Sequence, residues 1–410
     1  MAQYCKDHHD FKIGWITAIQ TEYVAACALL DDEYDPLPSV SREDNNSYTF
    51  GRMGKHDVVI ATLPTGRYGL TSAANVAKDM MRSFPSLRFG LLVGIAGGVP
   101  GTSHDIRLGD VVVGTPDRAS GGVIHYAYGK TVQNRPFERT GSLNAPPSIL
   151  LTAVQHLAAT HERKGHHIQK TIEAMVERWS KLEAYRRPPT ETDVLYKPSG
   201  KAVQPAVVRR EPRNADEDDP KIHYGLIGSA DQLMKNALVR DKIAEREGIL
   251  CFEMEASGLM NDFPCLVIRG ICDYADSHKN KTWQPYAAAT AASYAKELLQ
   301  LIPSQVPSQR TNPPEAGNGA FTNFGIVQNQ SGQQILWRAG GLWCTCGAVT
   351  QPGLRLAALL QTGRETSLST AFKSLRTKYS AASDIPWQHL LSFSKVYGMQ
   401  RKTLEHHISG

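Results

Sequence analysis

The chain has 410 residues, of which 41% are hydrophobic and 21% are charged, a balance that is ordinary for a soluble globular protein. At about 100–200 residues per domain, this length predicts either one large domain with an appendage or two domains. The formal net charge of +5 is small for the size and gives no reason to expect a nucleic-acid partner. The apolar runs are short and interrupted by glycine, whereas a bilayer needs about 20 apolar residues, so no membrane segment is expected.

The cysteines and the N-terminus indicate the compartment. The N-terminal stretch MAQYCKDHHDFK lacks the apolar core of a signal peptide. The seven cysteines are an odd number, and most of them lie in or beside apolar segments. Reduced thiols and a cytoplasmic location are therefore expected. Cys344 and Cys346 form a CTC pair without a second pair or a suitably spaced histidine, so no metal site is expected.

Strands and helices alternate from residue 11 onward. KIGWITAI is typical of a strand, and TEYVAACALLDD is typical of a short amphipathic helix. A hairpin is predicted for YTFGRM and VVIATL, and TSAANVAKDMMRSF has helical spacing. FGLLVGIAGGV is a continuous apolar run of the kind that forms strands buried on both faces in α/β proteins.

The pattern changes at about residue 146. Helix is predicted up to about residue 185, and the following stretch is rich in proline and charge, which predicts a flexible surface insertion ending near residue 220. Alternation then returns and closes with the alanine-rich helix YAAATAASYAKELLQLI. Residues 11–302 are thus expected to form one α/β domain, a central mixed β-sheet flanked by helices, with an insertion at about 146–220.

The remainder of the chain carries no motif with recognisable chemistry. Residues 303–320 are rich in proline and read as a linker. Residues 321–410 contain more basic than acidic residues. We expect this region to be an interaction or oligomerisation segment.

Four segments place polar groups where strands end, which is where ligands of open α/β sheets bind. They are AIQTEY with Glu22, the glycine cluster VGIAGGVPG, FEMEASG with two glutamates, and VIRGICDYADSHKN with Asp273. Each alone has a plain structural explanation, such as a helix cap, a tight turn or a solvated strand. As a strand, FEMEASG would place Glu253 and Glu255 on one face and Met254 on the other.

Together, in this order, the four segments resemble the nucleoside phosphorylase/nucleosidase superfamily, and most closely its methylthioadenosine/S-adenosylhomocysteine nucleosidases. KIGWITAIQTEY is similar to the strand and catalytic glutamate of that group, FEMEASG to its ribose-binding motif, and VIRGICDYAD to the strand that ends in its catalytic aspartate. IHYGLIGSADQLMKN further resembles the form found in fungal multidomain proteins.

The resemblance implies a role for each matching residue. Asp273 would act as general acid on the purine base and Glu22 would activate water, an arrangement analogous to the two carboxylates of glycosidases. Glu255 would accept hydrogen bonds from both ribose hydroxyls, and Glu253 would support it. The other residues implied to contact substrate are Ile95 and Gly97 at the glycine turn, Met254 under the sugar, Trp283 beside the sugar or its 5′ group, and Ser229 to Leu233 around the base.

Departures from the family pattern bear on the reaction and the substrate. The arginine and the Arg-x-Gly-Ser pattern with which the phosphorylases grip phosphate are absent, and Glu22 would repel phosphate, so hydrolysis is favoured. Ile95 replaces the small hydroxyl residue usual in the nucleosidases. Arg67, Arg269 and Lys279 are surplus to a neutral substrate; they are either solvated surface charges or contacts to a 5′-phosphate.

Three readings follow from the sequence. The first is a hydrolase acting on a purine nucleoside or nucleotide, without cofactor and, as relatives commonly do, assembling as a homo-oligomer. The second is a phosphate-dependent phosphorylase. The third is a non-catalytic nucleoside-binding module that signals through the C-terminal region, although binding alone would not require Glu22 and Asp273 beside Glu255.

Overall fold

The computed structural model describes residues 6–101, 104–117, 119–198, 206–213 and 220–304, and the backbone of the short strands β13 (Arg338–Ala339) and β14 (Leu342–Trp343). The chain divides into two compact units, Met1–Gln309 and Arg310–Gly410, and each is considered by itself. In the second unit, β13 and β14 pair antiparallel. The CTC pair, most of the predicted linker and nearly all of residues 321–410 lie outside the described residues.

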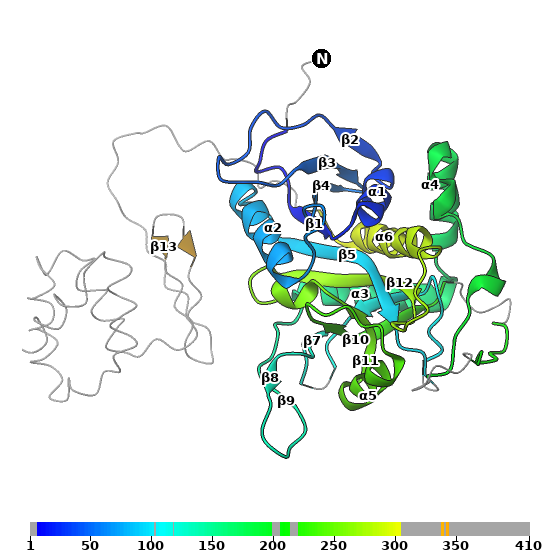
Figure 1. Cartoon of the computed structure of the whole chain (residues 1–410). Helices are drawn as coiled ribbons and strands as arrows, with labels where there is room; N and C mark the ends of the chain where they lie inside the picture. Colours follow the sequence, from blue (N-terminus) through cyan, green and yellow to red (C-terminus); the bar gives the residue numbers. More distant parts are fainter. Residues whose placement is uncertain are drawn as a thin grey trace, which may run out of the picture. The chain divides into compact units, whose positions relative to one another are not determined.

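A ten-stranded mixed sheet forms the centre of the first unit (Figure 1). Its strand order is β11-β10-β6-β12-β5-β1-β4-β3-β2, with β7 beside β10. The bounds are β1 (Ile13–Thr17), β2 (Asp32–Tyr34), β3 (Tyr48–Met53), β4 (His56–Thr62), β5 (Phe89–Gly98), β6 (Val111–Gly114), β7 (Val123–His125), β10 (Ile222–Ser229), β11 (Ile249–Glu253) and β12 (Cys265–Asp273). The central strands β4, β1, β5 and β12 run parallel, so their carboxyl ends lie at one edge.

The edge strand β11 bends back to the middle of the sheet. Besides its parallel pairing with β10, it pairs antiparallel with the end of β5, where Phe252 lies opposite Gly97 and Cys251 opposite Gly98. This second pairing brings the end of β11 beside the carboxyl ends of β5 and β12. Polar residues that follow these strands are thereby gathered at one place.

Helices cover both faces of the sheet. On one face α6 (Gln284–Leu301) packs against β5 and β12, with α1 (Gln20–Ala28), α3 (Ser148–Lys164) and α4 (Ile168–Arg178) beside it (Figure 1). The alanine-rich sequence of α6 favours helix, and its small side chains allow close packing on the sheet. On the opposite face lies α2 (Leu70–Ser83), and α5 (Ala237–Glu247) flanks β11. The α/β domain predicted from the sequence is confirmed.

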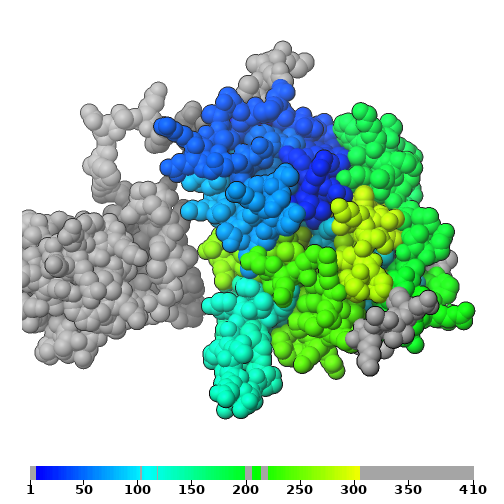
Figure 2. Space-filling view, viewed as in Figure 1, coloured from blue at the N-terminus to red at the C-terminus, as the bar shows by residue number. Residues whose placement is uncertain are grey.

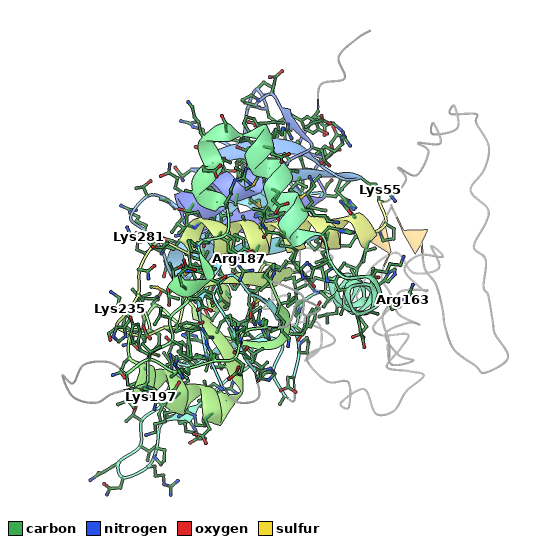
Figure 3. All side chains as sticks on the ribbon, turned by 90° about the vertical axis from the view of Figure 1, so that its right-hand side faces the viewer. Lys55, Arg163, Arg187, Lys197, Lys235 and Lys281 are labelled. Carbon is green, nitrogen blue, oxygen red and sulfur yellow. The ribbon has the colours of Figure 1, made fainter. Side chains whose placement is uncertain are left out.

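The proline- and charge-rich stretch was expected to be a flexible surface insertion, and its described parts are instead packed onto the domain. After α4 the chain forms the 3₁₀ turns η1 (Ser180–Tyr185) and η2 (Thr190–Thr192). Arg213 then pairs with the buried carboxylate of Asp110 through both terminal nitrogens, at 2.7 and 2.6 Å. Figure 3 shows Arg187 and Lys197 of this stretch on the same half of the view as Lys281, which follows β12. The charges that suggested disorder therefore find partners in the domain.

A short hairpin made of β8 (Gly129–Lys130) and β9 (Glu138–Arg139) projects from the first unit (Figure 2). Among the described residues, the longest helices are too short or too polar to cross a bilayer. Four cysteines of this unit, Cys27, Cys251, Cys265 and Cys272, are free thiols, and the last three are buried.

Candidate active site

Glu22 lies in the first turn of α1, and its carboxylate points back into the sheet. Its Oε2 accepts hydrogen bonds from the backbone N–H groups of Ala18 (2.6 Å) and Ile19 (3.1 Å), and its Oε1 accepts one from Ile95 (2.8 Å). Burial raises the pKa of Glu22, while the positive charge of Arg269 and the three backbone hydrogen bonds oppose that rise. A buried and firmly oriented carboxylate is thus held at the end of β1.

Glu253 and Glu255 lie beside one fully buried guanidinium, that of Arg269 on β12. The Nη2 of Arg269 donates to Glu253, and it lies 3.5 Å from Oε2 of Glu255. A strand through both glutamates would have placed them on one face, but β11 ends at Glu253, and the 3₁₀ turn η3 (Ala256–Gly258) begins after Met254 and Glu255. Glu253 makes this turn possible, since its carboxylate accepts the N–H groups of Glu255 and Ala256.

Glu255 is therefore presented by a turn. Its Oε1 faces the backbone N–H of Gly69 at 3.4 Å, and its Oε2 faces that of Met254 at 3.3 Å. Burial, and next the negative charge of Glu253, raise the pKa of Glu255 to about 8, against the opposing effect of Arg269. This carboxyl group can consequently change its protonation near neutral pH.

Two glycines of β5 allow the acidic side chains to approach the strand. A Cβ at Gly94 would lie 2.4 Å from Oε1 of Glu22, and a Cβ at Gly97 would lie 2.8 Å from Oδ1 of Asp273. Glu22 and Asp273 therefore approach β5 at points three residues apart, or about 10 Å along the strand. Gly97 was expected to contact substrate and lies beside Asp273. Ile95 was also expected to contact substrate; it is half-buried, and its backbone N–H donates to Glu22.

Asp273 is the last residue of β12 and is buried. Its Oδ1 accepts a hydrogen bond from the backbone N–H of Ala275 at 2.8 Å. Its Oδ2 accepts one from Sγ of Cys272 at 3.2 Å and lies 3.1 Å from Nζ of Lys279. Each oxygen of this carboxylate therefore has a defined local partner.

The residues expected around the base and the 5′ group are less closely grouped. Ser229 is fully buried, and its Oγ accepts the N–H of Ser257 at 2.9 Å, which ties the end of β10 to η3. Leu233 is half exposed. Trp283 is buried, packs on Tyr286 and donates from Nε1 to Oγ1 of Thr192 in the insertion, a partner that the sequence did not indicate.

The three cations expected as phosphate contacts occupy different environments. Arg67 is exposed, in the loop that precedes Gly69. Lys279 is paired with Asp273. The expectation for Arg269 does not fit its placement, because its guanidinium is fully buried and engaged by carboxylates.

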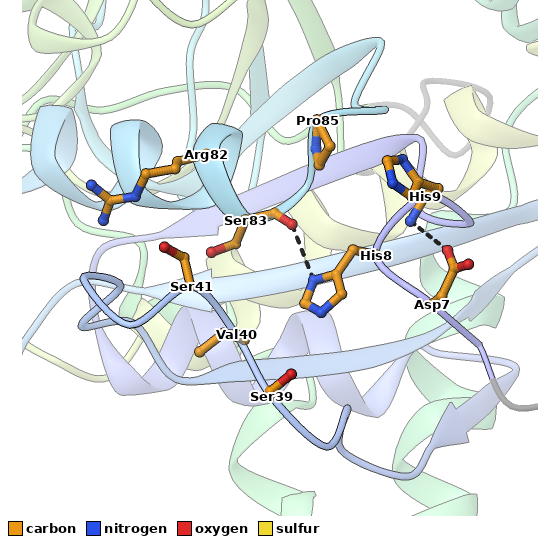
Figure 4. Close-up of a pocket in the computed structure, with 9 residues that line it drawn as sticks. All are labelled: Asp7, His8, His9, Ser39, Val40, Ser41, Arg82, Ser83 and Pro85. Carbon is orange, nitrogen blue, oxygen red and sulfur yellow. Dashed lines mark hydrogen bonds between the residues drawn. The ribbon is translucent and has the colours of Figure 1, made fainter.

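A separate surface cavity of about 420 Å³ lies at the other ends of the strands, near the start of β1 and β5 (Figure 4). His8 contacts the carbonyl of Ser83 there at 3.0 Å, and Arg82 is already paired with Glu43 and Asp79. Among the described residues there is no group of three or more side chains suited to hold a metal ion. Glu22, Glu255 and Asp273, the residues expected to act on substrate, lie at the carboxyl ends of the strands and do not line this cavity.

An α/β domain with buried carboxylates at the carboxyl ends of adjacent strands has the layout of an enzyme for small molecules. The chain belongs to the phosphorylase superfamily, whose family model matches residues 12–302. This assignment agrees with the family resemblance seen in the four sequence segments.

Individual relatives extend the comparison. A nucleotide-binding leucine-rich repeat (NLR)-like protein of the fungus Hyaloscypha variabilis is 47% identical over 72% of this chain, and the match spans only 30% of that relative's length. A 5′-methylthioadenosine/S-adenosylhomocysteine nucleosidase of Mycobacterium bovis is 25% identical over 62% of this chain and 84% of its own. Among solved structures, the nucleosidase of Neisseria meningitidis with that name is similar at 18% identity and a TM-score of 0.47, covering 70% of this chain and 98% of its own.

Proposed function

We propose that the protein hydrolyses the N-glycosidic bond of a purine nucleoside or nucleotide. The observation that carries the proposal is the placement of Glu22 and Asp273 at Gly94 and Gly97 of one strand, with Glu255 close enough to Glu22 for the two carboxyl groups to interact. Glu22 follows β1 and Asp273 ends β12, the two strands on either side of β5, which supports a water-activating base and a base-protonating acid acting on one substrate. The nucleosidase relative at 25% identity supports the same reaction class.

Each side chain has one task in the proposed reaction. Asp273 donates a proton to the purine as the bond between C1′ and the base nitrogen breaks, so that the base leaves neutral. Glu22 accepts a proton from the water whose oxygen bonds to C1′, and burial, which raises the pKa of Glu22, makes its carboxylate a stronger base. Glu255 accepts hydrogen bonds from the two ribose hydroxyls. One water molecule is consumed, and the products are the free base and the sugar.

Phosphorolysis is the second candidate, and one observation favours it. Within the described chain, Nε and Nη1 of the buried Arg269 have no hydrogen-bond partner, and a buried donor normally finds one. An oxygen of phosphate could accept from Nη1. Against this, Glu22, Glu253 and Glu255 all act electrostatically on the same guanidinium, so a phosphate ion would enter a negative environment.

The test is release of free base by the purified full chain. Adenosine, methylthioadenosine, AMP and ATP are each incubated with and without phosphate. Base release that does not need phosphate is expected from at least one substrate, and comparison of the four reveals the 5′ group that the site accepts. Strict dependence on phosphate would replace hydrolysis by phosphorolysis. Absence of release from every substrate would leave the non-catalytic binding module as the explanation.

A further inference from the structure

We propose that Asp193 of the insertion and Arg240 of α5 are positioning residues, which hold the carboxyl group of Asp273 through the peptide that joins Tyr274 to Ala275. The proposal builds on the proposed function, because it assigns these residues a part in orienting its general acid. Both positioning residues bind Tyr274, the residue that follows Asp273, and act on Asp273 through it.

The peptide group between Tyr274 and Ala275 has both its polar atoms engaged. Its carbonyl oxygen accepts a hydrogen bond from Nη1 of Arg240 at 2.5 Å, and its N–H donates to Oδ1 of Asp273 at 2.8 Å. A trans peptide is planar, and its C=O and N–H point in opposite directions. Fixing the carbonyl therefore fixes the direction of the N–H that meets the catalytic carboxyl group.

Arg240 is unusual among surface-helix arginines because only 2% of it is exposed. Charged side chains are rarely buried so completely without partners, and its partners here are the carbonyl of Tyr274 and the carboxylate of Asp241. Burial of this guanidinium against one carbonyl indicates that the position of that carbonyl is strongly specified.

The side chain of Tyr274 is held from the insertion. Its hydroxyl donates to Oδ1 of Asp193, and Arg210 both pairs with Asp193 at 2.9 Å and stacks over the tyrosine ring at 5.2 Å. Tyr274 is 3% exposed. The residue after the catalytic aspartate is therefore fixed at two points, its carbonyl by Arg240 and its hydroxyl by Asp193.

The insertion makes two more contacts with the loop that follows Asp273. Tyr196 stacks on His278 with ring centroids 4.1 Å apart, and Thr192 accepts the indole hydrogen bond of Trp283. Together with those to Tyr274, these contacts come from Thr192, Asp193, Tyr196 and Arg210 of the insertion. The described part of the insertion thus holds this loop at several points.

The conformation of Ala275 explains why such fixation is needed. Its φ is +50°, in the left-handed region that residues with a Cβ avoid. Strained residues persist where their surroundings over-determine the conformation. If the anchors were released, the peptide would be free to turn, and its N–H would no longer hold Asp273.

The test compares two full-length variants that each lose one tyrosine hydroxyl. Tyr274→Phe removes the bond to Asp193. Tyr286→Phe removes a bond from Tyr286 to Oε1 of Gln169 at 3.0 Å, which also joins the insertion to the domain. The packing of the Tyr286 ring on Trp283 is kept in this variant, because phenylalanine retains the ring. Hydrogen exchange is followed at the amide of Ala275, and kcat and KM for base release are measured in parallel.

Exchange at Ala275 should accelerate at least about tenfold in Tyr274→Phe, with kcat about tenfold lower and KM within twofold, whereas Tyr286→Phe changes neither. The losses in Asp193→Ala combined with Tyr274→Phe should be less than additive, because both changes remove the bond between the Tyr274 hydroxyl and the Asp193 carboxylate. Unchanged exchange in Tyr274→Phe, or faster exchange with an unchanged kcat, would overturn the proposal. If the wild-type protein releases no base, the proposed function fails, and the exchange measurement still decides whether the anchors hold this peptide.

Discussion

Arg269 of β12 and Glu253 of β11 form an ion pair from which solvent is excluded, with the side chains 0% and 1% exposed. The same guanidinium is 3.5 Å from Glu255 and acts electrostatically on Glu22. One cation therefore partly compensates three buried carboxyl groups that come from two separate segments of the chain. Removing it should affect both stability and catalysis.

Arg269→Met should lower the free energy of unfolding by about 3–5 kcal/mol, because it leaves buried carboxylates without a partner. Urea denaturation measures this change. The control is Arg186→Met, which removes an exposed pair with Glu183 and should cost no more than about 1 kcal/mol. Equal losses in the two variants would show that Arg269 is not the centre of the cluster.

Glu255 should make the stability of the domain depend on pH. Its pKa is about 8 in the folded protein and 4.5 ordinarily, so the folded state retains a proton that the unfolded state loses between these values. Stability from this group should fall as pH rises from 4.5 to 8. Glu255→Gln should flatten that part of the curve of unfolding midpoint against pH. The control is Glu177→Gln, at an exposed position of α4, which should leave the curve of unfolding midpoint against pH unchanged.

Gly94→Ala should reduce the rate of base release by at least about tenfold, because the new Cβ would lie 2.4 Å from both Oε1 of Glu22 and Nη1 of Arg269 and would displace them. Steady-state kinetics measure the loss. Gly101→Ala is the matched control, since a Cβ there meets nothing within 4 Å. A Gly94→Ala enzyme with normal kcat would mean that Glu22 does not need this approach to β5.

Asp273→Asn and Glu255→Ala should fail in different ways. The first removes the proton donor and should lower kcat by about 10²–10⁴-fold with little effect on KM. The second removes the acceptor for the ribose hydroxyls and should raise KM about tenfold or more. Asp57→Asn, at a carboxylate paired with Lys6 away from the site, should alter neither constant. Full activity in both site variants would refute the assignment of these roles.

The α/β core was predictable because its strands are long apolar runs and its helices have clear periodicity. The start of α5 at Ala237 was less predictable, because Asn236 caps this helix by accepting the N–H groups of Leu238 and Val239. A local side-chain hydrogen bond decided the boundary over the apolar pattern.

Within the site, the acidic residues were predictable and their partners were not. Glu22, Glu255 and Asp273 follow strand ends and match a known motif order. The role of Arg269 depends on Glu253, which lies on another strand, and sequence spacing does not reveal such pairing. The described parts of the proline- and charge-rich stretch were expected to be flexible for the same reason, since Asp193 and Arg210 find the partners Tyr274 and Ile106 far away in the sequence.

The most direct measurement is the identity of the sugar product formed by the full chain in phosphate buffer. The account predicts free base and free sugar in equal amounts, at a rate that does not depend on phosphate concentration, and loss of both in Asp273→Asn. A sugar 1-phosphate as the product, or base release that persists undiminished in Asp273→Asn, would contradict it.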